Sequence, residues 1–251
     1  MKSRSWQSAD VYWGVAGAVL LVVLWEGAVR AFDLPAYILP GILEILVSMV
    51  DLQSTLMDAT WMTVMEAVSG YVIGSACGIL LAVILTLIPT LKRWCLPAAI
   101  AINSVPVVAY APLVLLWFGM GAESKIVMVS LAVGFTVFLS ALTGLDQANR
   151  KSIDLLRSFG ANPLMIIWRL KLPAALPLIA SAMRVSTTRS MIVAIVTEML
   201  GAYGGLGWVI YQATLQIDFV QVWAAIFAAS LVSLIFFGAV SMIERKVIFW
   251  R

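Results

Sequence analysis

The feature that most limits how this chain can fold is the length of its apolar stretches. A helix needs roughly 20 apolar residues to cross the hydrocarbon core of a bilayer, and six stretches with few or no charges reach that length. Core helices of a soluble domain are usually shorter. We therefore predict an all-α integral membrane protein with about six transmembrane helices. The stretches are Val11–Phe32, Trp61–Ile88, Trp94–Phe118, Ile126–Leu145, Leu176–Leu200 and Phe219–Ile243.

Composition agrees with this class and argues against several others. Hydrophobic residues make up 63% of the chain and charged residues 12%, about half the charged fraction of a soluble domain. The basic residues are dispersed between apolar stretches, so we predict no nucleic-acid partner. With no histidine and two cysteines without metal-ligand spacing, the sequence predicts no catalytic residues and no metal site.

The positions of lysine and arginine predict the orientation. Basic residues are enriched in cytoplasmic loops, and an arrangement with both termini in the cytoplasm places twelve there against two outside. The first apolar stretch is longer than a signal-peptide core and has no small-residue cleavage site after it, so we expect it to be retained. The twelve are Lys2, Arg4, Lys92, Arg93, Arg150, Lys151, Arg157, Arg169, Lys171, Arg245, Lys246 and Arg251, and the two are Arg30 and Lys125.

Two segments between the predicted spans have a pattern of their own. On the outer side, residues 34–58 contain Pro40-Gly41 before an apolar stretch that ends at Val50. We expect a short helix along the outer surface there, with an ordinary loop as the alternative.

The second segment, residues 146–177, carries the signals of a bent helical hairpin on the cytoplasmic side. Ser152 is a candidate N-cap for a helix through Phe159, Gly160 suits the end of that helix, and Asn162-Pro163 suits the start of the next one. Leu155, Leu156 and Phe159 form an apolar face. Either a protein partner or the membrane interface would have to cover such a face.

This hairpin resembles the EAA loop of binding-protein-dependent ABC importer permeases. The resemblance rests on Asp154-Leu155-Leu156, on Gly160, and on Leu172-Pro173 followed by Pro177. The acidic position of the family holds aspartate here, and both alanines are leucines. The resemblance implies a segment that docks on a separate ATPase, through Asp154, Leu155, Leu156, Phe159, Gly160, Pro163, Leu172 and Pro173.

The resemblance extends over nearly the whole chain. Asn103–Lys125, Thr197–Ile210 and the ending IERKVIFWR are similar to the branch for nitrate, sulfonates, taurine and pyrimidine precursors. It implies one permease domain over residues 1–251 with the type I importer fold, in the bacterial inner membrane. It also implies a second permease copy, two ATPase subunits and an external solute-binding protein as partners, besides membrane lipid.

The chain has no phosphate-binding loop of the GxxxxGK[ST] type. We therefore predict that it is not an enzyme and binds no cofactor, and that ATP and its magnesium ion are held by the partner ATPase.

Polar residues within the apolar stretches are the candidates for the solute path, because ionisable groups in lipid are costly. Helical periodicity places Arg184, Thr188, Met191 and Glu198 on one face and Arg189 elsewhere. Arg184 has the alternative of reaching the inner headgroups, and Glu198 of serving as a structural partner. Asn103 and Tyr110 are further candidates on a span loosened by prolines.

Two other functions stay open from the residues alone. A secondary transporter is disfavoured because no internal repeat is visible, and a membrane enzyme is disfavoured because no activated nucleophile or carboxylate cluster is visible. As the cargo of an importer we expect a small organic anion or a heterocycle.

Overall fold

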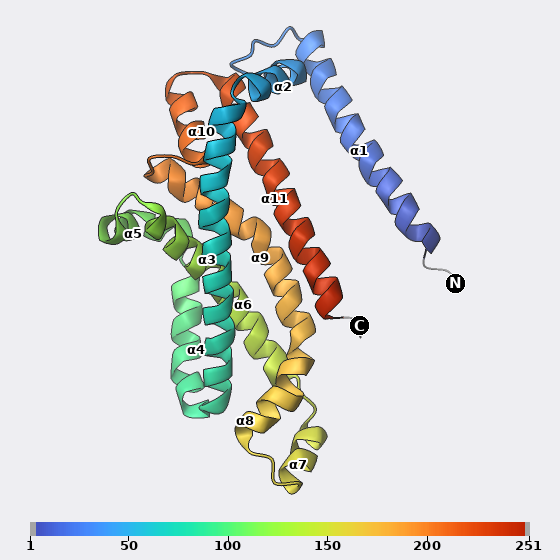
Figure 1. Ribbon diagram of the computed structural model, residues 1–251, viewed down its shortest axis with the longest axis vertical. Coiled ribbons are helices and arrows are strands. Elements are labelled where there is room, and N and C mark those ends of the chain that lie inside the picture. The colour runs from blue at the N-terminus through green and yellow to red at the C-terminus, as the bar shows by residue number, and fades with distance from the viewer. Residues whose placement is uncertain (1–3, 249–251) are drawn as a thin grey trace. The chain divides into compact units, whose positions relative to one another are not determined.

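The computed structural model describes residues 4–248, and this part of the chain is helical with no strands (Figure 1). Its contacts divide it into two compact units. One unit contains the chain up to Met57 together with Val209–Ala228, and the other contains Asp58–Trp208 and the chain from Ala229 onwards. The single permease domain over residues 1–251 stays a prediction.

The first unit holds α1 (Arg4–Ala31) and α2 (Ile42–Asp51), together with parts of α3, α10 and α11. The expected short helix in residues 34–58 is confirmed as α2, which begins directly after Pro40-Gly41. The carboxylate of Glu26 links α1 to α2, since it accepts hydrogen bonds from Arg30 at 2.9 Å and from the Ile42 backbone N–H at 3.1 Å.

The second unit is built around two long helices that pack closely, α6 (Ala122–Asp146) and α9 (Leu172–Leu200). Most of the larger buried side chains of α6, among them Phe138 and Leu145, belong to the hydrophobic core of this second unit. The remaining helices that begin in this unit or cross into it are α3 (Gln53–Leu87), α4 (Pro89–Asn103), η1 (Val107–Tyr110), α5 (Ala111–Phe118), α7 (Arg150–Ser158), α8 (Pro163–Ile166), η2 (Ile167–Lys171), α10 (Leu206–Leu215) and α11 (Phe219–Val247).

Glycines bring α3 against α6 in this unit. Gly70, Gly74 and Gly78 recur at every fourth position of α3, so they share one face of the helix. A Cβ atom on Gly74 would lie 2.5 Å from the Ser130 carbonyl oxygen. Small residues at such spacing allow two membrane helices to approach at backbone distance. The contact also explains why this face of α3 carries glycine at all three positions.

We expect Gly74→Ala to destabilise the protein by about 1–3 kcal/mol, because the added methyl group has no room and the helices must separate. The measurement is the midpoint of thermal unfolding of the detergent-solubilised protein. Gly238→Ala on α11 is the matched control, since a Cβ there meets nothing within 4 Å. Equal midpoints for both variants would contradict the close packing.

In the part of the chain that the structure describes, five helical segments are long and apolar enough to cross a membrane, and a sixth would be a bent pair. Five of the six predicted spans correspond to these helices. The third, Trp94–Phe118, is wrong as one continuous helix, because α4 and the segment Val107–Phe118 are bent by 88°. Pro106 lies at the break. A helix is interrupted there because proline donates no backbone hydrogen bond and disfavours a helical conformation of the residue before it.

Candidate functional site

The predicted hairpin projects from one end of α6 and α9 as the helices α7 and α8 (Figure 1). Its first helix begins earlier than the sequence suggested. Asn149, not Ser152, is the N-cap of α7, and its side chain accepts a hydrogen bond of 2.9 Å from the Lys151 backbone N–H. Both residues are good caps, but a start at Asn149 extends the helix by almost one turn.

The bend of the hairpin is a helix end of defined geometry. Gly160 has a φ of +80°, a left-handed conformation that glycine adopts without strain. The Gly160 N–H donates to the Arg157 carbonyl at 2.9 Å, and the Ala161 N–H donates to the Leu156 carbonyl at 3.0 Å. These are the two bonds of a Schellman motif.

Two residues separate the C-cap of α7 from the next helix, which begins at the predicted Asn162-Pro163. The Asn162 side chain caps α8 by accepting from the Met165 N–H at 2.8 Å, and Pro163 occupies the first turn. Gly160 is therefore confirmed as a helix end, and Asn162-Pro163 as the start of the next helix.

The hairpin presents an unpartnered apolar face. Leu155 is 57% exposed and Phe159 is 78% exposed, and they stand four residues apart on one side of α7. Leu156 is half-buried. Asp154 lies 3.8 Å from Arg157, with both side chains largely exposed.

Two other residues of the predicted docking set lie at the base of the hairpin. Through η2 the chain continues without a break into α9, and Leu172 and Pro173 form the first turn of that helix. Leu172 packs against the hydrophobic core, whereas Pro173 is exposed. The predicted docking set thus has an exposed tip on α7 and a base in which Leu172 is packed and Pro173 is exposed.

A second site, a buried polar cluster, lies around Glu198 of α9. The side chain of Glu198 is 1% exposed. Its carboxylate accepts hydrogen bonds of 2.7 Å from the Thr63 hydroxyl and from the Gly207 backbone N–H. The Thr63 oxygen in turn accepts from the Leu206 N–H at 2.9 Å. Since Leu206 and Gly207 begin α10, side chains of α3 and α9 satisfy N–H groups that a helix start leaves unpaired.

Two glycines provide the space for this arrangement. Gly205 has a φ of +93°, and a Cβ atom there would overlap the Glu198 carboxylate. A Cβ atom on Gly207 would overlap the Ile195 carbonyl oxygen. The Gly-Leu-Gly sequence after Glu198 is therefore required by the close approach of a carboxylate to a helix start.

Lys125 and Glu66 complete the polar cluster. Lys125 is fully buried, and its ammonium group donates to the carbonyl oxygens of Met120, Gly121 and Gly201 at 2.6, 3.2 and 2.5 Å. Three donated bonds require the charged form. Glu66 is 1% exposed and lies close enough to Glu198 and Lys125 to interact with both.

The sequence analysis missed Thr63, Glu66 and Lys125 as members of this site. It assigned Lys125 to the outer side as an ordinary basic residue. A carboxyl group near the start of the apolar stretch Trp61–Ile88 was the available signal for Glu66. Nothing local marks Thr63, because its partners lie on residues far away in the chain.

Arg184, Thr188, Met191 and Glu198 of the predicted face all lie on α9, but they differ in exposure. Met191 and Glu198 are buried, whereas Thr188 is exposed. The guanidinium of Arg184 lies 3.3 Å from the carboxylate of Glu244 on α11. The two ends of this face therefore make separate protein contacts.

The other path candidates lie on three different elements, α4, η1 and α9. Arg189 is exposed and donates a hydrogen bond of 3.1 Å to the Thr136 hydroxyl. The Tyr110 hydroxyl donates to the Ile102 carbonyl at 3.1 Å, across the break after α4, and Asn103 is the last residue of that helix. Within residues 4–248, no group of three His, Cys, Asp or Glu side chains could hold a metal ion.

Solved structures share this fold. The chain matches a methionine ABC transporter in an inward-facing conformation with a TM-score of 0.68 and 20% identity, over 78% of this chain and 98% of that chain. It matches an amino acid ABC transporter with a TM-score of 0.62 and 19% identity, over 80% and 97%. The fold is that of an ABC importer permease.

Sequence comparison identifies the family. Residues 74–249 match the family of binding-protein-dependent transport system inner membrane components, and the chain belongs to this family of multi-pass membrane proteins. It is 30% identical to a formylaminopyrimidine transport permease protein, ThiX, of Halalkalibacterium halodurans, over 93% of both chains. It is 30% identical to the taurine transport system permease protein TauC of Escherichia coli, over 78% of this chain and 74% of that protein. The chain is therefore a membrane permease subunit and not an enzyme.

Proposed function

We propose that two copies of this chain form the translocation path of an importer in the bacterial inner membrane. Each copy would dock on one of two separate ATPase subunits, which bind ATP and its magnesium ion, and an external binding protein would deliver the solute. Both termini and the α7–α8 hairpin would face the cytoplasm. The observation that carries this proposal is the hairpin, whose capped bend presents exposed Leu155 and Phe159.

For the cargo, we propose a small organic anion or a heterocycle. The family relatives named above transport formylaminopyrimidine and taurine, and a further relative in Bacillus subtilis, 25% identical over 95% of this chain and 87% of that protein, is a putative aliphatic sulfonates permease. These compounds are small and polar. A path for them needs polar side chains facing an aqueous cavity.

The test is uptake by proteoliposomes that contain this chain, its ATPase and its binding protein. We expect accumulation of taurine-like or pyrimidine-like compounds that requires ATP on the hairpin side. Uphill uptake by the isolated chain, driven by an ion gradient without ATP, would overturn the proposal in favour of a secondary transporter.

Arg189 is the better placed of the two arginines of α9 to attract an anionic cargo. Arg184 already faces the carboxylate of Glu244 at 3.3 Å. Arg189 contacts a neutral hydroxyl, and among the side chains of residues 12–248 no carboxylate lies within salt-bridge distance of it.

We expect Arg189→Gln to lower uptake of an anionic cargo about tenfold, because one charge-assisted hydrogen bond contributes about 1.5–3 kcal/mol. Arg189→Lys keeps the charge and should retain most of the uptake. The measurement is initial uptake rate in proteoliposomes, with ATPase assembly determined in parallel. If Arg189→Gln transports an anion at the normal rate, Arg189 does not contact the cargo.

A further inference from the structure

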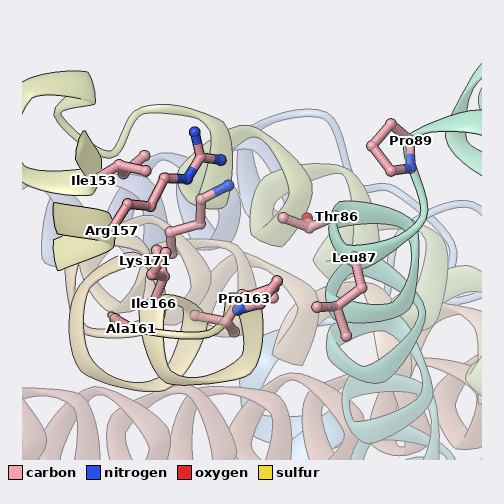
Figure 2. A pocket seen from close by; sticks show the side chains of 10 residues that line it. Thr86, Leu87, Pro89, Ile153, Arg157, Ala161, Pro163, Ile166 and Lys171 are labelled. Atoms are coloured by element: carbon pink, nitrogen blue, oxygen red, sulfur yellow. The ribbon is translucent and has the colours of Figure 1, made fainter. Parts of the chain in front are cut away.

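A cavity of about 250 Å³ lies between the hairpin and the junction of α3 with α4 (Figure 2). Its walls are mostly apolar and include Leu87 and Pro89 on one side and Pro163 and Ile166 on the other. Two basic residues, Arg157 and Lys171, also line it. Figure 2 shows their nitrogen atoms on the same side of the cavity, with Thr86, Leu87 and Pro89 across from them.

The charges around this cavity leave a positive excess. The ammonium of Lys171 is near enough to be repelled by Arg157 and Lys92 and attracted by Asp146. Asp146 is already held by Lys92 at 2.5 Å, and Lys171 has no carboxylate within salt-bridge distance among the described residues. Asp154, the acidic neighbour of Arg157, is largely exposed and 3.8 Å away. A bound anion with a single negative charge would neutralise this positive excess.

The cavity lies on the opposite side of α7 from the exposed apolar face. Ile153 and Arg157, which line it, are four residues apart on one side of the helix. Leu155 and Phe159 lie about 200° further round, given about 100° per residue. An ATPase docked on Leu155 and Phe159 would leave the cavity uncovered. This step rests on the proposed function.

The surroundings of the cavity favour a lipid over a soluble anion. Leu87 ends α3, a helix that could cross a membrane, and Pro89 begins α4. Trp94 on α4 is 78% exposed and Trp168 on the hairpin is 64% exposed. Tryptophan is enriched at the headgroup layer. Basic pockets beside membrane helices on the cytoplasmic side bind anionic headgroups.

We propose that this cavity binds an anionic phospholipid, with Arg157 and Lys171 on its phosphodiester and the apolar walls against the glycerol and the first acyl carbons. A phosphodiester carries a single negative charge, which matches the positive excess. The lipid would thereby join the hairpin to the α3–α4 junction.

The experiment is native mass spectrometry of the purified permease–ATPase complex titrated with phosphatidylglycerol or with phosphatidylcholine of the same acyl chains. We expect the wild type to bind phosphatidylglycerol about thirtyfold more tightly than phosphatidylcholine, since each of the two basic residues contributes about 1 kcal/mol near an anionic headgroup and about 1.4 kcal/mol corresponds to a tenfold change. Arg157→Gln combined with Lys171→Gln should abolish this preference. Lys151→Gln combined with Arg169→Gln is the matched control, because both residues belong to the hairpin but do not line the cavity.

A second variant tests the cavity without changing charge. Ala161→Phe should fill it and also abolish the preference, with folding checked by size-exclusion chromatography. Unchanged phosphatidylglycerol preference in both variants would overturn the proposal. Inorganic phosphate that binds in the cavity and displaces no lipid from it would also overturn the proposal, because the site would then hold a free anion and no lipid. Co-purification of the ATPase with the permease tests the proposed function separately. If the ATPase does not co-purify but the lipid preference is intact, only the docking of the ATPase is contradicted.

Discussion

Replacement of Gly160 by valine is expected to lower ATP-driven uptake about tenfold while the membrane helices stay folded. A Cβ atom on Gly160 meets nothing within 4 Å, so the effect arises from the backbone and not from a collision. At a φ of +80°, the backbone conformation of a residue with a side chain is less favourable by about 1–2 kcal/mol of free energy than that of glycine. A β-branched residue is especially unfavourable there. About 1.4 kcal/mol corresponds to a tenfold change in the population of the bent hairpin.

The matched variant is Gly160→Asn, because asparagine tolerates left-handed conformations better than any β-branched residue. We expect it to retain most of the uptake. The measurements are ATPase co-purification and uptake in proteoliposomes, both compared with thermal stability of the permease alone. If valine and asparagine behave alike, or if valine leaves assembly and uptake unchanged, the bend does not position the docking face.

Local features of the fold could be predicted because their causes lie within a few residues. Apolar length identified five of the six stretches as helices long enough to cross a membrane. The end of α7 at Gly160 and the restart at Asn162-Pro163 follow from backbone preferences of those residues. The early start at Asn149 was missed because two good caps stand three residues apart, and local preference does not decide between them.

The bend after α4 could be predicted only in part. Hydropathy measures how apolar a segment is, but it does not indicate whether the helix axis bends within that segment. Pro106 indicated a weakened hydrogen-bond ladder, but the 88° angle depends on how η1 and α5 pack against α6. Contacts of this kind join residues that are far apart in the sequence, so no local sequence pattern predicts them.

The polar cluster shows the same limit at a site. Glu198 was a candidate for solute contact because a carboxylate in an apolar stretch is unusual. Its partners Thr63 and Gly207 lie 135 and nine residues away along the chain. In the structure those partners bind both carboxylate oxygens, so the contacts of Glu198 are those of a cap at the start of α10. Its contact with solute stays a prediction.

We expect Glu198→Leu to be the most damaging of the substitutions considered, with a loss of about 3–5 kcal/mol, the usual cost of removing one partner of a buried charge. The leucine would leave the Gly207 N–H without its acceptor, whereas the Thr63 hydroxyl would keep the Ala59 carbonyl at 3.1 Å. It would also leave Lys125 without the carboxylate that balances it. The measurement is thermal unfolding of the purified complex, together with the yield of folded protein in the membrane.

Glu66→Gln is the matched variant, because both carboxyl groups are buried in the same cluster. We assign the positive charge to Lys125, which donates three hydrogen bonds, and the negative charge to Glu198, which accepts one at each oxygen. A second negative charge on Glu66 would then be unbalanced. Glu66 should therefore be the neutral member, and a glutamine there should change the unfolding midpoint little. Equal losses for Glu198→Leu and Glu66→Gln would contradict this division of charge. A stable Glu198→Leu protein with defective uptake would instead restore Glu198 to the solute path.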